Sequence, residues 1–308
     1  MKVAYLIVTH TNPGLLRKMI MTLCSEGCAF FIHVDKKARI SDFSAIEGEN
    51  IFFTHSRVSV YWGEFSVIRA VIVLMLAALA SREQYDYFVL LSGSDYPLRS
   101  GLYVQEFLRA NQGRQFMSLV KIPSEAAGKP LSRLDRIWIQ SDQPIRRFVF
   151  RAIAKLGLAR RDHRKHLRSL EPYGGDMWWA LTNDACRYIL EFMERNPYVE
   201  NYFLHTPAPD ELFFQTILGN SPFAPHVQRN FHFADWSAGT SHPAMITAKH
   251  VEKFESQEQV LVNDVYGSGE ALFARKFSDD APELLTRIDT MIRRKERLSF
   301  QPDADKSR

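Results

Sequence analysis

The first half of the chain alternates short β-rich runs with helical segments, and this alternation constrains the fold more than any other feature. The predicted strands are Val3–Thr9, Ala29–Asp35 and Tyr87–Ser92, and the predicted helices are 13–25, 64–82 and 102–111. Strands that alternate with helices are typical of βαβ units, whose strands run parallel. The sequence therefore predicts an α/β fold with a mixed, mainly parallel central sheet flanked by helices.

Polar residues follow each of the predicted strands. His10 comes after the first strand, Asp35 ends the second, and Ser92-Gly93-Ser94-Asp95 ends the third. Ligands of open α/β sheets bind outside the carboxyl ends of the strands. We therefore expect these three clusters to converge on one crevice.

The second half of the chain is less regular. Residues 113–173 are irregular and basic, after which Gly175–Thr182 is a predicted strand and 183–195 a predicted helix capped by Asn183. An amphipathic helix is expected over 279–297, before a polar tail at 301–308. Because no linker marks a boundary, we predict a single domain over 1–300.

Charge, cysteine content and hydropathy limit the possible functions. A net charge of +4 over 308 residues is low for a nucleic-acid-binding domain. Cys24, Cys28 and Cys186 are too few for a disulfide framework and are expected to be buried small hydrophobic residues in a reducing compartment. The apolar run Val67–Ala80 contains Arg69 and falls below the ~18 residues of a membrane span. We therefore expect a cytoplasmic protein without a nucleic-acid partner.

Pro209-Asp210-Glu211 precedes the apolar run Leu212-Phe213-Phe214, so both acids are predicted in the first turn of a helix. A carboxylate there is stabilised by the helix dipole. On residue type alone, these acids need do no more than complement the helix N-terminus.

Seven segments, which span nearly the whole chain, form an ordered set. They are Ala4–His10 (AYLIVTH), His33–Lys37 (HVDKK), Val60–Ser66 (VYWGEFS), Leu91–Leu98 (LSGSDYPL), Gly174–Trp179 (GGDMWW), Pro209–Glu211 (PDE) and Leu272–Phe277 (LFARKF). In this order and spacing the set resembles the core-2/I-branching β-1,6-N-acetylglucosaminyltransferase and peptide O-xylosyltransferase family. Chance resemblance of seven ordered segments is not expected.

The resemblance implies a single A-type glycosyltransferase domain, which is Rossmann-like, with a nucleotide-binding half at 1–112 and an acceptor and catalytic half at 113–300. It implies transfer of N-acetylglucosamine or xylose from a UDP-sugar to a glycan or other hydroxyl acceptor, with inversion and without a metal or other cofactor. We expect a role in envelope or surface glycan synthesis.

The resemblance assigns the catalytic base to Glu211. A sugar hydroxyl is a poor nucleophile, and a carboxylate within hydrogen-bond reach can remove its proton as the new bond forms. Inversion needs a single displacement, so the reaction requires no covalent nucleophile.

The leaving nucleoside diphosphate needs a cationic partner as its charge grows. The Asp-x-Asp sequence Asp303-Ala304-Asp305 lies in the polar tail and is not a metal site. In the resembling family basic side chains replace the metal, which assigns Lys276 and, beside it, Arg275 to the diphosphate. A second cation expected before Lys276 is unassigned; Lys249, Lys253 and His242 are candidates, and Ala244 stands where a basic residue is expected.

The same resemblance assigns the remaining binding residues. The predicted nucleotide-sugar contacts are Val8, His10, Asp35, Trp62 and Asp95, in addition to Arg275 and Lys276. Core packing is the alternative for Trp62, a structural histidine for His10, and a turn before Pro97 for Asp95.

Acceptor sugars present apolar faces on which aromatic rings stack, and their hydroxyls bind carboxylates. The predicted acceptor contacts are Asp176, Trp178 and Trp236. Alternation along a strand sends Trp178 and Trp179 to opposite faces, so one of the pair is expected in the core.

Residues 146–168 carry nine basic residues against Asp162, with apolar residues between them. This pattern predicts a basic amphipathic helix, which could contact an anionic membrane from the cytoplasmic side. The alternative is a solvated helix face, and Gly157 weakens a continuous helix.

Two other function classes fit parts of the sequence. Another nucleotide-using α/β enzyme would need a phosphate-binding glycine loop after the first strand, but His10-Thr11-Asn12-Pro13-Gly14 has no such spacing. A non-catalytic carbohydrate-binding module could use the tryptophans, and its binding would not depend on Glu211.

Overall fold

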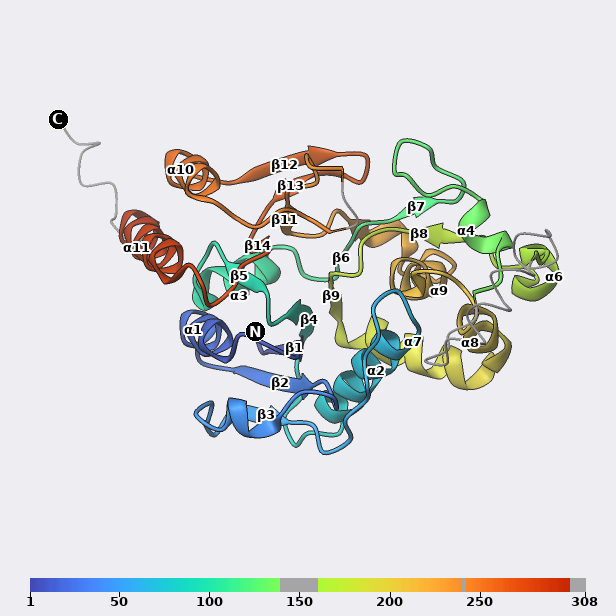
Figure 1. Ribbon diagram of the computed structural model, residues 1–308, viewed down its shortest axis with the longest axis horizontal. Helices are drawn as coiled ribbons and strands as arrows, with labels where there is room; N and C mark the ends of the chain where they lie inside the picture. Colours follow the sequence, from blue (N-terminus) through green and yellow to red (C-terminus); the bar gives the residue numbers. More distant parts are fainter. Residues whose placement is uncertain (139–159, 240–241, 300–308) are drawn as a thin grey trace.

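A seven-stranded sheet forms the centre of the computed structural model, which describes residues 1–138, 160–239 and 242–299 (Figure 1). The strand order is β10-β6-β9-β4-β1-β2-β3, and β9 runs antiparallel to its neighbours β4 and β6 while the other pairs are parallel. The strands are β1 (Val3–Thr9), β2 (Cys28–Val34), β3 (Ile51–Phe53), β4 (Tyr87–Ser92), β6 (Gln115–Met117), β9 (Trp179–Thr182) and β10 (Val227–Gln228). The predicted mixed, mainly parallel sheet is confirmed.

Helices cover both faces of this sheet (Figure 1). Because side chains alternate along β1, Tyr5 packs in the core beneath α1, α3 and α11, whereas Leu6 packs in the core beneath α2, α7 and α9. Burial on both faces explains the continuous apolar run of this strand. The helices are α1 (Pro13–Leu23), α2 (Ser66–Leu79), α3 (Gly101–Ala110), α4 (Ser132–Asp135), α6 (His163–Leu167), α7 (Asn183–Arg195), α8 (Pro197–Phe203), α9 (Phe213–Gly219), α10 (Ala248–Ser256) and α11 (Pro282–Ser299).

A second sheet of three strands brings the third strand end of the first half against the C-terminal part of the chain. Its order is β11 (His232–Ala234), β14 (Phe273–Arg275) and β5 (Asp95–Pro97). The register places Asp95 opposite Arg275. Two small sheets complete the strands: β12 (Leu261–Asp264) with β13 (Gly267–Glu270), and β7 (Val120–Lys121) with β8 (Tyr173–Gly174).

Several local predictions are wrong in detail. The strand predicted over 175–182 begins only at Trp179, and the cap of α7 is the side chain of Thr182, which accepts from Ala185 N at 3.3 Å, rather than Asn183. The C-terminal helix begins at Pro282 rather than at residue 279.

The cysteines differ in their burial. Cys24 caps the C-terminus of α1 and is exposed, whereas Cys28 begins β2 and is buried, as is Cys186. The expectation of three buried cysteines is therefore wrong for Cys24, because α1 ends one residue before it.

Most of the basic stretch at 146–168 lies outside the described residues, and a helix reaching through to 168 is wrong. Residues 160–162 are not helical, and the helix α6 begins only at His163. Arg161 does not face solvent as a membrane contact would: its guanidinium lies 3.7 Å from the Tyr202 ring centroid and donates to Tyr202 O at 2.7 Å. The described part therefore gives no support to membrane contact.

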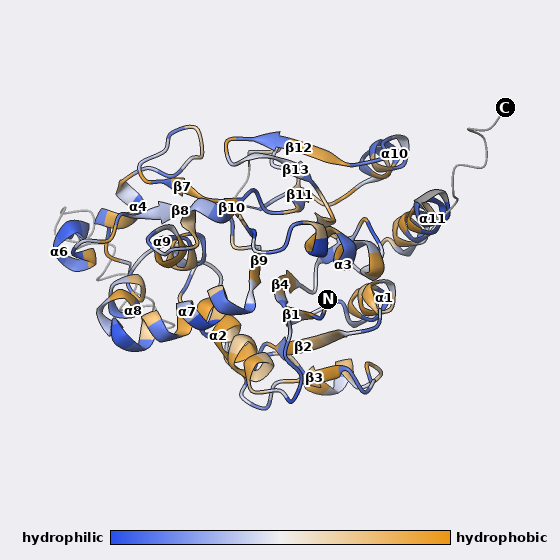
Figure 2. Ribbon diagram, turned by 180° about the vertical axis from the view of Figure 1, so that it is seen from behind, coloured by the Kyte–Doolittle hydropathy of each residue, from blue (hydrophilic) through white to orange (hydrophobic). Residues whose placement is uncertain are grey.

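The hydrophobic residues of the helices lie where the helices pack against the sheet (Figure 2). The helix α2 is strongly apolar and only 14 residues long. Among the described helices, none combines the length and the apolar character that crossing a membrane requires.

Candidate active site

A cavity of about 630 Å³ opens at the carboxyl ends of β1, β2 and β4. Thr9, Asp35 and Ser92, at or just after the ends of these strands, contribute to its wall. The crevice predicted from the strand ends is therefore present. The predicted site residues that line it are Val8, His10, Asp35, Trp62, Asp176, Trp178, Glu211, Trp236, Arg275 and Lys276.

Asp35 and Trp62 lie on the part of the wall formed by the first half of the chain. Asp35 Oδ1 accepts a hydrogen bond from Lys37 N at 2.9 Å, which fixes the carboxylate in the loop after β2. The Trp62 side chain is 72% exposed, and its ring centroid is 5.0 Å from that of His242. Core packing of Trp62 is thus wrong, because its ring lies at the cavity mouth.

Arg275 is buried at the end of β14 and lines the cavity. Its guanidinium carbon lies 4.0 Å from the Trp178 ring centroid, and its Nε is 3.5 Å from Asp95 Oδ1. Burial lowers the pKa of Arg275, while Asp95 acts in the opposite direction. The Arg275 guanidinium thus lies between an aromatic ring and a carboxylate at the cavity wall.

Asp95 is fully buried and does not line the cavity. Its Oδ2 accepts from Ser92 N at 2.6 Å, and burial raises its pKa although Arg275 opposes the shift. The prediction that Asp95 contacts the nucleotide sugar needs correction, because Asp95 lies behind Arg275 and orients that guanidinium.

Three lysine or arginine side chains of the described residues line the cavity, namely Lys37, Lys276 and Arg275. Lys276 lines the cavity beside it, and burial, reinforced by Arg275, lowers the pKa of Lys276. Lys249 and Lys253 do not line the cavity, and the Lys253 ammonium lies 5.7 Å from the Phe233 ring centroid. His242 lines the mouth of the cavity, next to Trp62.

Glu211 belongs to a short 3₁₀ turn, Pro209–Glu211, and not to the first turn of α9 as predicted. Leu212, with φ of −135°, separates the turn from the helix. Glu211 Oε2 accepts from both Lys129 Nζ and Arg133 Nη1. Burial alone would raise the pKa of Glu211, but the two cations outweigh it and hold the pKa below its ordinary value of 4.5.

Sequence reasoning missed Lys129 and Arg133, which come from the irregular stretch 113–173. Lys129 is buried at 5% exposure after a tight loop in which Ser124 and Lys129 exchange backbone hydrogen bonds. Single basic residues in a basic stretch look like solvated surface. No pattern in the sequence distinguishes them.

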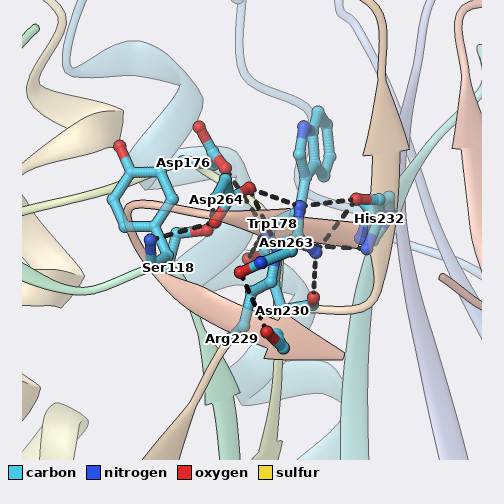
Figure 3. A network of polar contacts seen from close by, with 10 residues as sticks. Ser118, Asp176, Trp178, Arg229, Asn230, His232, Asn263 and Asp264 are labelled. Atoms are coloured by element: carbon cyan, nitrogen blue, oxygen red, sulfur yellow. Dashed lines mark hydrogen bonds and ion pairs between the residues drawn. The ribbon is translucent and has the colours of Figure 1, made fainter. Parts of the chain in front are cut away.

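Asp176 lies in a polar network at the cavity wall (Figure 3). Its Oδ2 accepts from Ser118 Oγ at 2.8 Å and from Asn230 Nδ2 at 3.5 Å, and burial raises its pKa. A Cβ on Gly175 would lie 1.7 Å from the Ser118 carbonyl oxygen. Only glycine therefore allows the close approach that places Asp176 in the wall.

The same network ties the β12–β13 hairpin to this wall (Figure 3). Arg229 donates to Asp264 Oδ2 from Nε at 3.0 Å and from Nη2 at 2.8 Å. Asn230, the next residue, also donates to the Trp178 carbonyl at 3.3 Å. The hairpin thereby braces the segment that carries Asp176 and Trp178.

The tryptophan pair divides as alternation predicts. Trp179 is fully buried, and Trp178 lines the cavity. Trp236 also lines the cavity and is 50% exposed, so a ring face is accessible at the mouth.

His232 is a cavity residue that the sequence did not single out. It is 3% exposed, and its ring stacks on that of Phe273 with centroids 5.4 Å apart. Burial, with Arg275 and Arg229, holds its pKa well below the ordinary range, so the ring is neutral.

Within residues 1–138, 160–239 and 242–299, no group of three or more histidine, cysteine, aspartate or glutamate side chains is arranged to hold a metal ion.

The fold and the cavity together define an α/β protein with an open binding crevice at the carboxyl ends of its parallel strands. A family model described as Core-2/I-Branching enzyme matches residues 3–259. The chain therefore belongs to the Core-2/I-branching enzyme family, a family of glycosyltransferases.

Curated relatives agree with this assignment. Xylosyltransferase 2 of Mus musculus is 26% identical over 311 residues, which cover 93% of this chain and 33% of that protein. Xylosyltransferase oxt of Drosophila melanogaster is 26% identical over 246 residues, which cover 76% of this chain and 26% of that protein. The chain thus spans about a third of the length of the relatives it matches.

A solved structure, mouse xyloside xylosyltransferase 1 in its apo form, covers 88% of this chain and is covered over 97% of its own length. Its TM-score is 0.34 at 12% identity, so the overlap adds nothing to the family assignment.

Proposed function

We propose that this protein is an inverting glycosyltransferase that works without a metal and transfers a sugar from a UDP-sugar to a hydroxyl acceptor. The observation that carries the proposal is the shared cavity, whose lining includes the carboxylate of Glu211 and the adjacent cationic side chains of Arg275 and Lys276. A single-displacement transfer needs both: a base for the incoming hydroxyl and positive charge for the leaving diphosphate.

Glu211 is proposed as the base. Its carboxylate is ionised at neutral pH because Lys129 and Arg133 lower its pKa, and it lines the cavity. As the acceptor oxygen bonds to the anomeric carbon, the hydroxyl proton leaves to the carboxylate and the bond to the diphosphate breaks.

Arg275 and Lys276 are proposed to stabilise the diphosphate. Preorganised positive charge in a partly buried cavity acts more strongly than in water and needs no reorganisation during the reaction. The contacts of Arg275 with Trp178 and Asp95 support such a preorganised position.

The two ends of the cavity suit the two substrates. Asp35 and Trp62 offer a carboxylate for ribose hydroxyls and a ring for the uracil base, near Val8 and His10. Asp176, Trp178 and Trp236 offer a carboxylate and aromatic faces for the acceptor sugar. We propose these roles for the matching residues.

The donor is the first property to test. We expect UDP-N-acetylglucosamine or UDP-xylose to raise the Tm of the protein and to be hydrolysed slowly in the absence of an acceptor. A panel of UDP-sugars compared with UDP and with other nucleotides would identify the donor. If no UDP-sugar changes the Tm or is hydrolysed, the proposed function is wrong.

Metal independence gives a separate expectation. Because Arg275 and Lys276 supply the positive charge, donor turnover should be unchanged in excess EDTA and should not rise on addition of Mn²⁺ or Mg²⁺. Loss of most of the activity in EDTA, with recovery on adding a divalent ion, would contradict the metal-independent mechanism while leaving the family assignment intact.

A further inference from the structure

Asp210 and Glu211 are adjacent carboxyls that both line the cavity, yet their surroundings differ. One oxygen of Glu211 is occupied by two cations, Lys129 and Arg133. Asp210 makes no ion pair with either, and its Oδ1 is buried without a hydrogen-bond partner in the part of the chain that the structure describes. Within the Pro209–Glu211 turn, one carboxyl is therefore paired with two cations, and the carboxyl next to it has a buried oxygen without a hydrogen-bond partner.

This difference affects where a proton is held. Two hydrogen bonds from cations favour the ionised form of Glu211 and lower its pKa. Burial, and then the charge of Glu211, raises the pKa of Asp210 to about 7. A proton that reaches Glu211 is therefore more stable on Asp210.

The charged side chains that act on the Asp210 carboxyl include Glu211, Lys129, Arg133 and Arg275. The turn that carries Asp210 packs on α9, which has no titratable residue, and on α2, whose Arg69 points toward Glu200 at 3.7 Å. Glu64 follows Gly63, whose carbonyl accepts from Ala208 N at 3.1 Å, so a further carboxyl belongs to the segment that is hydrogen-bonded to this turn.

We propose that Asp210 is a second proton-accepting residue of the reaction, and that it takes over the proton which Glu211 removes from the acceptor hydroxyl. This inference rests on the proposed function. The hydroxyl O–H bond breaks as its oxygen bonds to the anomeric carbon, and the electron pair of the broken sugar–phosphate bond leaves with UDP. The proton moves through Glu211 to ionised Asp210 and is released to water with the products.

The arrangement restores Glu211 as an anion between its two cations before the products leave. A carboxylate with depressed pKa is a weak proton acceptor, because the efficiency of a general base falls with its pKa. A neighbour whose pKa is near the working pH compensates for this weakness.

The pH profile of donor turnover tests the inference. With the donor found in the panel, wild-type hydrolysis should fall as the pH drops below about 7, because Asp210 must be ionised to accept the proton. Asp210→Asn should lower turnover at pH 8 by about 10- to 100-fold and remove the decline near pH 7. The remaining acid decline should follow Glu211, below pH 4.5.

The matched control is Glu171→Gln, an exposed carboxylate that pairs with Lys121 at 3.1 Å outside the cavity. Its turnover and pH profile should equal those of the wild type. An Asp210→Asn profile that also equals the wild-type profile would overturn the inference.

A stability measurement examines Asp210 without any substrate. A carboxyl whose pKa is raised on folding contributes stability below its unfolded pKa, and this stability is lost as the pH rises through the folded pKa. As the pH rises from about 4 to about 7, the Tm of Asp210→Asn should therefore increase relative to the Tm of the wild type. A Tm difference that stays constant over this range would overturn the inference.

Different results would contradict the proposed function and the role of Asp210. A wild-type protein that hydrolyses no UDP-sugar contradicts both the proposed function and the role of Asp210. An active wild-type protein whose pH profile is unaffected by Asp210→Asn contradicts the role of Asp210 alone.

Discussion

Glu211→Gln is expected to lower the turnover of the donor by about 10²–10⁴-fold, the range typical of losing a general base. Glutamine keeps the size of the side chain and can accept hydrogen bonds from Lys129 and Arg133, but it cannot accept the acceptor proton. UDP binding should be nearly unchanged, because Glu211 is proposed to act on the acceptor. Steady-state kinetics and the Tm shift given by UDP would measure the two effects.

The variant also leaves two cations without their anion. Lys129 is buried, so loss of its partner is expected to lower the Tm of the free protein. Glu171→Gln again serves as the control for exchange of a carboxylate for an amide. Wild-type turnover in folded Glu211→Gln protein would exclude Glu211 as the base, whereas a binding module would show no turnover in either protein.

The lowered pKa of Glu211 also predicts a pH effect. A carboxylate whose folded pKa is depressed stabilises the protein above its unfolded pKa, and this stability is lost as the pH falls through the folded pKa. For Glu211 the loss should occur below pH 4.5. This loss of stability below pH 4.5 is well separated from the decline in donor turnover near pH 7, which we attribute to Asp210.

The fold was predictable from sequence because its core strands are buried on both faces. The apolar run of β1 was recognised to the residue, and its polar continuation at His10 marked the cavity edge. The β5–β14 pairing was not predictable, because it joins Asp95 to Arg275 across nearly 180 residues of chain without any local pattern.

Only part of the candidate site could be predicted from the sequence. Residues at strand ends, such as Asp35, were located by topology, whereas Glu211, Arg275 and Lys276 were assigned only by resemblance. Lys129 and Arg133 were missed because their role depends on a tertiary contact with Glu211. Asp95 was placed on the correct strand end but on the wrong side of Arg275, since sequence does not show which side chain is nearer the ligand.

Lys276→Met is expected to lower turnover by about 10²–10³-fold, the loss typical of removing one group that stabilises developing negative charge. Methionine keeps the length and apolar stem of lysine but carries no charge. Lys276 suits this test better than Arg275, because removal of Arg275 would leave the buried Asp95 without its cation and would lower the stability of the fold. The affinity for UDP should fall with turnover, as measured by titration.

Lys253→Met is the matched control, since Lys253 lies over the Phe233 ring and outside the cavity. Its turnover and its UDP affinity should remain those of the wild type. Comparison of Glu211→Gln with Lys276→Met then separates removal of the acceptor proton from stabilisation of the diphosphate. Glu211→Gln should lose turnover and keep UDP binding, whereas Lys276→Met should lose both, because the diphosphate is present in the substrate and carries more charge in the transition state. Unchanged UDP affinity in Lys276→Met would mean that Lys276 does not contact the diphosphate.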